Sequence, residues 1–164
     1  MAAGLSVAGA QDFIANLNGA QDGGGARTGS GIFNLTLTGT TMALSGSYSG
    51  LSANATAGHI HGPGAPGVSV GVLYNLVTSG NLTIGGTAGT LSGTVNLVPL
   101  GTYTVAAQIA DLDNGRWYFN IHDGNFPGGE IRGQILPVPE PSTLALAGLG
   151  LGGLVAWRLR RRRA

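Results

Sequence analysis

Cysteine and lysine are absent from this chain of 164 residues, and each absence excludes whole classes of chemistry. Without cysteine there is no disulfide scaffold, no thiolate ligand for a metal ion and no cysteine nucleophile. Without lysine there is no P-loop for nucleotide phosphates and no Schiff base. Charged residues make up only 9% of the chain, so Gly, Ser, Thr and Asn must form much of its surface.

The few charges are distributed unevenly along the chain. Up to Pro137 there are three arginines against six acidic residues, a net charge of −3, whereas five arginines against one glutamate give +4 from Val138 onward. The main part of the chain has no basic face to displace counterions from phosphates, so we expect no binding to nucleic acid. Hydrophobic residues still reach 43%, which predicts a folded domain and not a disordered one.

Short runs that alternate apolar and polar residues fill residues 11–137, with Gly, Asn or Ser between them. Alternation with a period of two is typical of strands that bury one face. The predicted strands are 12–17, 30–38, 41–49, 58–61, 68–76, 89–97, 102–109, 117–122 and 131–136. We therefore predict an all-β domain over residues 11–137, an antiparallel, Greek-key-like β-sandwich or flattened barrel of about eight to nine strands.

The C-terminal residues 138–164 have three parts in a fixed order. Pro139, Glu140 and Pro141 form an extended break, because proline excludes helix locally. Residues 142–157 follow without a single charge and predict a hydrophobic helix, somewhat shorter than the roughly 20 residues that cross a bilayer core. The chain then ends in an arginine cluster, which the positive-inside rule places in the cytoplasm: Arg158, Arg160, Arg161, Arg162 and Arg163.

This three-part order resembles the PEP-CTERM sorting signal of bacteria that carry an exosortase. The resemblance implies export from a Gram-negative-type bacterium and a transient inner-membrane anchor formed by residues 142–157. It also implies processing near Pro139 by an exosortase-type protease, followed by release to the outer envelope or the extracellular space. Residues 1–10 end in Ala8-Gly9-Ala10, a small-x-small cleavage pattern, and we interpret them as the remnant of a secretory signal peptide.

The three histidines of the chain are the candidate metal ligands. His59 and His61 are two residues apart, so a strand places both imidazoles on one face about 6–7 Å apart. His122 ends an aromatic strand that we expect to lie beside them. Imidazole nitrogens in this arrangement suit copper or zinc, but histidines that hydrogen-bond the loops at one end of the domain would give the same pattern. Both interpretations remain open on the sequence alone.

Three blocks of the chain resemble the CHRD domain, which is named for chordin and occurs in bacterial envelope proteins. They are residues 13–21, residues 57–63 around His59 and His61, and residues 118–135, which run from Tyr118 through His122 and Gly128-Gly129-Glu130. The resemblance implies a β-sandwich fold and carries no agreed biochemical activity. It spans nearly the whole of residues 11–137.

Other polar residues have structural interpretations. Glu130 and Arg132 lie two apart on one predicted strand, where they would pair or support the histidine-bearing loops. Asp111 and Asp113 precede Asn114-Gly115, a pattern typical of a hairpin turn with too few acidic ligands for calcium. No nucleophile elbow or other catalytic set is recognisable, so we predict no catalytic residue.

Two functions are therefore compatible with the sequence. The first is an exported envelope or matrix protein with a structural or binding role, whose partners include extracellular polysaccharide. The second is a copper- or zinc-binding metalloprotein that uses His59, His61 and His122, with superoxide dismutase-like redox activity as its extreme form. With three histidines in all, the chain lacks the additional ligands of a dinuclear dismutase site.

Overall fold

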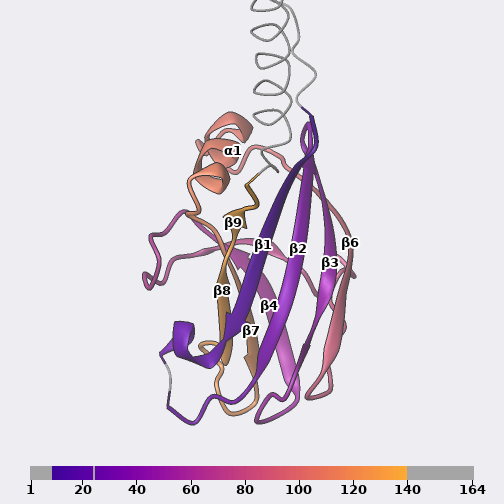
Figure 1. Ribbon diagram of the computed structural model, residues 1–164, viewed down its shortest axis with the longest axis vertical. Helices are drawn as coiled ribbons and strands as arrows, with labels where there is room; N and C mark the ends of the chain where they lie inside the picture. Colours follow the sequence, from indigo (N-terminus) through magenta and orange to yellow (C-terminus); the bar gives the residue numbers. More distant parts are fainter. Residues whose placement is uncertain (1–8, 24, 140–164) are drawn as a thin grey trace, which may run out of the picture.

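The computed structural model describes residues 9–23 and 25–139, which form one antiparallel sheet of nine strands with two short helices (Figure 1). The strand order is β5-β4-β7-β8-β1-β2-β3-β6, and β9 pairs with β1. The strands are β1 (Gln11–Asn18), β2 (Ser30–Thr38), β3 (Thr41–Ser49), β4 (Ala55–His61), β5 (Val72–Asn75), β6 (Gly89–Asn96), β7 (Tyr118–Asp123), β8 (Ile131–Gln134) and β9 (Leu136–Pro137). The all-β prediction is confirmed in its flattened-barrel form, as a sheet curled into a half-barrel.

The curl of the sheet brings its two halves together around one hydrophobic core. Alternate residues of each strand point inward, as the period of two requires. The rings of Phe33 in β2 and Phe119 in β7 meet edge to face, 5.1 Å between centroids, although these strands are not neighbours in the sheet. Members of this core that are at most 2% exposed include Phe13, Leu17, Phe33, Leu35, Met42, Ile60, Leu91, Phe119, Ile121 and Ile131.

Strands β2 and β3 lie at the predicted residues, and most others differ from prediction by a few residues at their ends. The strand predicted at 102–109 is wrong, because this segment forms helix α1 (Val105–Asp113). Thr104 caps the helix by accepting a hydrogen bond from the Ala107 N–H, and the buried Gln108 and Leu112 lie one turn apart. The aspartates of the predicted hairpin occupy its last turn, where Asp111 pairs with Arg116 at 2.9 Å.

Several expectations concern residues outside the described part of the chain. The interpretation of residues 1–10 as a signal remnant rests mostly on residues 1–8, and the membrane helix at 142–157 and the arginine cluster fall within 140–164. Within residues 9–23 and 25–139, no helix has the length and apolar character needed to cross a membrane.

Candidate metal centre

The three histidines lie on neighbouring strands in the middle of the half-sheet formed by β5, β4, β7 and β8. His59 and His61 come from β4, and His122 comes from β7, which pairs with β4 in antiparallel register. The alternation that turns Ile60 and Ile121 into the core turns all three imidazoles to the opposite face of the sheet. The pairing of β4 with β7 therefore joins residues that are 63 positions apart.

This opposite face is itself buried, so the histidines lie in a polar layer and not on the open surface. Every residue of β7 is buried, which means that both faces of this strand are covered. The chain after β4 covers one part of the layer, where Val70 meets the Tyr118 hydroxyl, and the turn after β7 covers another. His61 and His122 are each only 8% exposed, and His59 is half-buried.

The ring nitrogens of the three histidines converge on one point. One candidate ligand nitrogen from each ring lies within 4.8 Å of the other two. The closest pair is His59 Nδ1 and His122 Nε2, which are 3.0 Å apart. The ring centroids of His59 and His61 are 5.5 Å apart, and those of His61 and His122 are 6.0 Å apart. The structure thus brings together all three sequence-predicted ligands.

Hydrogen bonds to backbone carbonyls define the tautomers of two of these rings. Nδ1 of His61 lies 2.9 Å from the Val70 carbonyl oxygen, and Nδ1 of His122 lies 2.9 Å from that of Pro127. A carbonyl oxygen only accepts, so both Nδ1 atoms carry a hydrogen and both Nε2 atoms offer a lone pair. Metal-ligating histidines are commonly oriented by just this kind of bond.

Burial keeps the histidines neutral. It lowers the pKa of His59 to about 4, with smaller contributions from the neighbouring His122 and His61. Burial also lowers the pKa of His61 and of His122, in each case against the opposing effect of the carbonyl that its Nδ1–H contacts. A neutral imidazole is the form that ligates a metal ion, so near neutral pH the site needs no deprotonation of an imidazolium.

Three buried side-chain atoms of the described residues make no hydrogen bond: His61 Nε2, Asn120 Oδ1 and Asp22 Oδ2. Asn120 is the cross-strand partner of His59, and Asp22 lies close enough to interact electrostatically with His122. Each of the three atoms has a lone pair available to an electron-pair acceptor. Burying such an atom without a hydrogen-bond partner costs about 1–3 kcal/mol of stability. A buried polar group without a hydrogen bond in a native structure therefore needs an explanation.

Arg132 and Tyr118 hold the ring of His61 in place. The Tyr118 ring stacks on His61, with centroids 4.9 Å apart and planes 5° apart. The Arg132 guanidinium carbon lies 3.3 Å from the Tyr118 centroid, and its Nη2 donates to the Val68 carbonyl at 2.9 Å. Strands β4 and β8 flank β7, so this stack crosses three strands.

Glu130 supports the same region by binding backbone N–H groups. Its carboxylate is fully buried and accepts hydrogen bonds from the N–H groups of Thr28 and Gly29 at 3.2 Å and of Ser52 at 2.9 Å. Asp123, which sequence analysis missed, accepts in the same way from Ala53 at 2.8 Å. Both carboxylates hold the loop between β3 and β4 against the end of β7 that carries His122, and Glu130 also holds the segment before β2.

Asn120 and Asp22 also belong to the polar layer, and the exposed Asn75 lies at its edge, but none of the three was among the predicted site residues. Asn120 had a detectable signal, because it alternates with His122 along the strand and so shares its face. Asp22 lies on the 3-10 helix η1 (Gly19–Asp22), and Asn75 lies in β5. Their approach to the histidines depends on contacts between distant segments, which local pattern does not reveal.

Two models of known families match this chain. The model of the CHRD domain matches residues 13–135, three quarters of the chain, including all three histidines, Glu130 and Arg132. The chain belongs to the CHRD family. The model of the PEP-CTERM protein-sorting motif matches residues 137–162. No curated protein matches the chain in sequence.

These two matches define the coarse biology of the protein. A CHRD domain followed by a PEP-CTERM motif is an exported protein, which the membrane-associated exosortase system of Gram-negative bacteria sorts. The residues of the polar layer belong to the CHRD domain, and residues 137–162 carry the sorting motif. What the CHRD domain does after export is a separate question.

Proposed function

We propose that the CHRD domain of this exported protein binds one copper or zinc ion through His59, His61 and His122. The observation that carries the proposal is the convergence of three neutral imidazoles whose candidate ligand atoms lie within 4.8 Å of one another. An ion with metal–nitrogen bonds of about 2.0–2.1 Å holds tetrahedral ligand atoms about 3.3–3.4 Å apart. The histidines need only small side-chain movements to reach that spacing.

The hydrogen bonding of the site supports a metal ion over a purely structural role. His61 Nε2 is buried, oriented by the Val70 carbonyl and without a partner, which is how a metal ligand is presented before it binds. His122 has the same Nδ1–H to carbonyl bond. Because the ligands are imidazoles without a thiolate or carboxylate among them, and nitrogen sites bind Cu²⁺ more tightly than Zn²⁺, we expect copper to be preferred.

Metal analysis tests this proposal directly. The exported protein is purified from a sorting-competent host without chelators, and copper and zinc are measured by mass spectrometry before and after dialysis against micromolar copper. We expect one ion per chain, lost in His61→Ala. The exposed Asp113→Asn is the matched control and should retain the ion. A protein that takes up neither metal under these conditions would refute the proposal and favour the loop-supporting role of the histidines.

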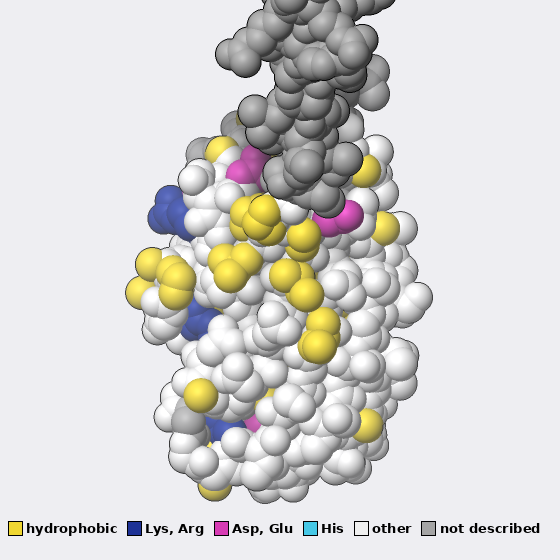
Figure 2. Space-filling view, viewed as in Figure 1, with side chains coloured by type: hydrophobic (Ala, Val, Ile, Leu, Met, Phe, Trp, Pro, Cys, Tyr) yellow, Lys and Arg dark blue, Asp and Glu magenta, His cyan; other side chains and the backbone are white. Residues whose placement is uncertain are grey.

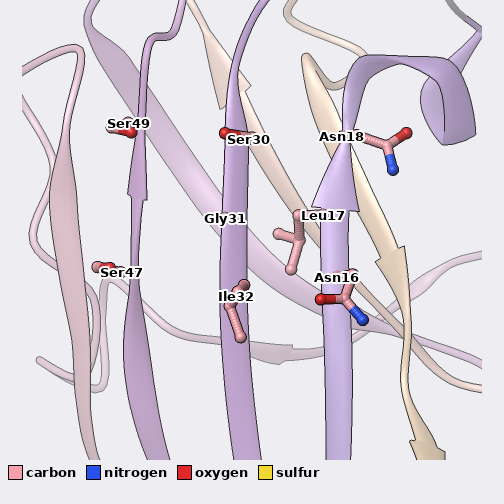
Figure 3. A pocket seen from close by; sticks show the side chains of 8 residues that line it. All are labelled: Asn16, Leu17, Asn18, Ser30, Gly31, Ile32, Ser47 and Ser49. Carbon is pink, nitrogen blue, oxygen red and sulfur yellow. The ribbon is translucent and has the colours of Figure 1, made fainter.

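A second candidate function, attachment to extracellular polysaccharide, is favoured by a different surface. A groove of about 480 Å³ crosses β1, β2 and β3 on the outward face of the sheet (Figure 3). No charged residue lines it; amide and hydroxyl side chains do, together with Gly31, the buried Leu17 and the exposed Ile32: Asn16, Asn18, Ser30, Ser47 and Ser49. In the space-filling view, charged side chains are few and scattered over the visible face (Figure 2). Such a lining matches an uncharged sugar polymer better than an anionic one.

Binding of the full chain to an insoluble neutral polysaccharide and to an anionic one tests this second function. We expect retention on the neutral polymer, reduced by Asn16→Ala together with Ser47→Ala. These two residues lie in one cross-strand row with Ile32. The matched control is Thr41→Ala, another exposed hydroxyl of β3 that lies outside the groove. Equal retention of the double variant would contradict a role for the groove.

A further inference from the structure

A chain of hydrogen bonds that all point the same way connects β5 to the histidine site. The N–H groups of Val77 and Thr78 donate to Asn75 Oδ1 at 3.0 and 2.9 Å. Asn75 Nδ2 then lies 3.3 Å from His59 Nε2, and His59 Nδ1 lies 3.0 Å from His122 Nε2. The chain ends where His122 Nδ1 meets the Pro127 carbonyl.

The Asn75 end of this chain determines which nitrogen of His59 carries the hydrogen. The amide cannot turn over without losing both backbone donors, because its oxygen accepts from the N–H groups of Val77 and Thr78. The amide nitrogen therefore faces His59. An amide nitrogen only donates, so His59 Nε2 must accept and the ring hydrogen must be on Nδ1.

The His122 end leads independently to the same tautomer. His122 donates through Nδ1 to the Pro127 carbonyl, so its Nε2 is an acceptor. The atom that faces it at 3.0 Å is His59 Nδ1, which must therefore be the donor. Two fixed groups on opposite sides of the ring thus require the same position for one hydrogen.

We infer that Asn75 is a positioning residue that fixes His59 as the Nδ1–H tautomer. In this tautomer Nδ1 of His59 cannot ligate an ion in the proposed metal site. The statement about the metal site rests on the proposed function, whereas the statement about the tautomer does not. The Nδ1 hydrogen of His59 points to His122 Nε2, so it occupies the space between two of the three ligand nitrogens. For Nδ1 of His59 to ligate an ion, this hydrogen must move to Nε2, where Asn75 offers a donor instead of an acceptor.

The difference from the other two histidines shows what this arrangement does. His61 and His122 each have a carbonyl acceptor at the nitrogen remote from the site, which favours metal ligation. His59 alone has a donor there, which opposes ligation. The site is therefore expected to bind its ion more weakly, and to release it more readily, than three well-oriented histidines would.

Replacement of Asn75 by aspartate tests the inference. In Asn75→Asp one carboxylate oxygen still accepts from the Val77 and Thr78 N–H groups, and the other accepts a hydrogen from His59 Nε2. His59 Nε2 then carries a hydrogen of its own, so that Nδ1 can release its hydrogen to solvent and ligate an ion when one binds. Because changes to the partners of ligating histidines alter metal affinity by about 10- to 100-fold, we expect Zn²⁺ to bind that much more tightly. Thr78→Asp, which adds the same charge to the same exposed turn, is the control and should change the affinity by less than about threefold.

Two measurements on the full chain in detergent separate this inference from the proposed function. Nitrogen-15 NMR of the metal-free protein should show His59 protonated at Nδ1 alone in the wild type and at Nε2 as well in Asn75→Asp. Calorimetric titration with Zn²⁺ alone then gives the affinities. A wild-type Nε2–H tautomer, or equal affinity of wild type and Asn75→Asp, overturns the inference. If NMR finds the ring hydrogens where we expect them but no variant binds Zn²⁺ or Cu²⁺, the proposed metal site is refuted. The role of Asn75 in fixing the His59 tautomer would then still stand.

Discussion

The polar layer makes the stability of the CHRD domain sensitive to pH in the range where histidine titrates. His59 has an ordinary pKa of 6.5 when unfolded and a pKa of about 4 in the folded protein, because it is buried beside two other imidazoles. Between these values the unfolded chain binds a proton that the folded chain does not. The free energy of unfolding therefore falls as pH decreases from about 6.5 toward 4.

The magnitude follows from the difference in pKa. A difference of about 2.5 units corresponds to about 3 kcal/mol at most, and the partial exposure of His59 reduces this to about 2 kcal/mol. His61 and His122 act in the same direction, since burial lowers the pKa of each. Asp22 acts against them, because burial raises its pKa and the folded state holds its proton more tightly.

Denaturant unfolding of wild type and His59→Gln at pH 7.5, 6.5, 5.5 and 4.5, with a chelator present, isolates the contribution of one ring. The other titrating groups largely cancel in the difference between the two proteins. We expect the wild type to lose about 2 kcal/mol more than the variant between pH 7.5 and pH 4.5. Two curves that run parallel across this range would show that His59 is not held neutral by the fold, and would refute the reasoning.

Three further predictions concern other parts of the chain. Glu130→Gln should lower the free energy of unfolding by about 2–3 kcal/mol in urea, against less than about 0.5 kcal/mol for the exposed Asp113→Asn, because a buried carboxylate loses charged hydrogen bonds. Gly129→Ala should lower the melting temperature by several degrees, since its φ of 130° is strained for alanine and the added methyl group meets the Asn120 amide. Intact-mass measurement of the released protein should show an end near Pro139, and a released form that keeps the arginine cluster would contradict this.

Much of the β-structure was predictable because its causes are local. Strand alternation is a property of neighbouring residues, so β2 and β3 were located at their observed bounds from pattern alone. The failure at residues 102–109 has an equally local cause. Alternating apolar residues in that segment are also compatible with a helix, and the cap at Thr104 with the buried Gln108 favours the helix.

The candidate site was predictable only in part. The His59–His61 pair shares a face by strand geometry, but its meeting with His122 required the pairing of β4 with β7. The roles of Asn75, Asn120 and Asp22 were not accessible to sequence reasoning. Each is an ordinary polar residue, and its importance comes from the folding of distant segments, which places it beside the histidines.

Composition and short-range order were sufficient for the class of fold, the two candidate ligands on one strand and the sorting signal, because each depends on residues adjacent in the chain. The tertiary structure decided the rest: that the non-core face of β4 and β7 is covered, that three imidazoles stay neutral, and that Asn75 orients one of them. Burial and hydrogen-bond direction are set by contacts across tens of residues, and such contacts exist only once the sheet has curled.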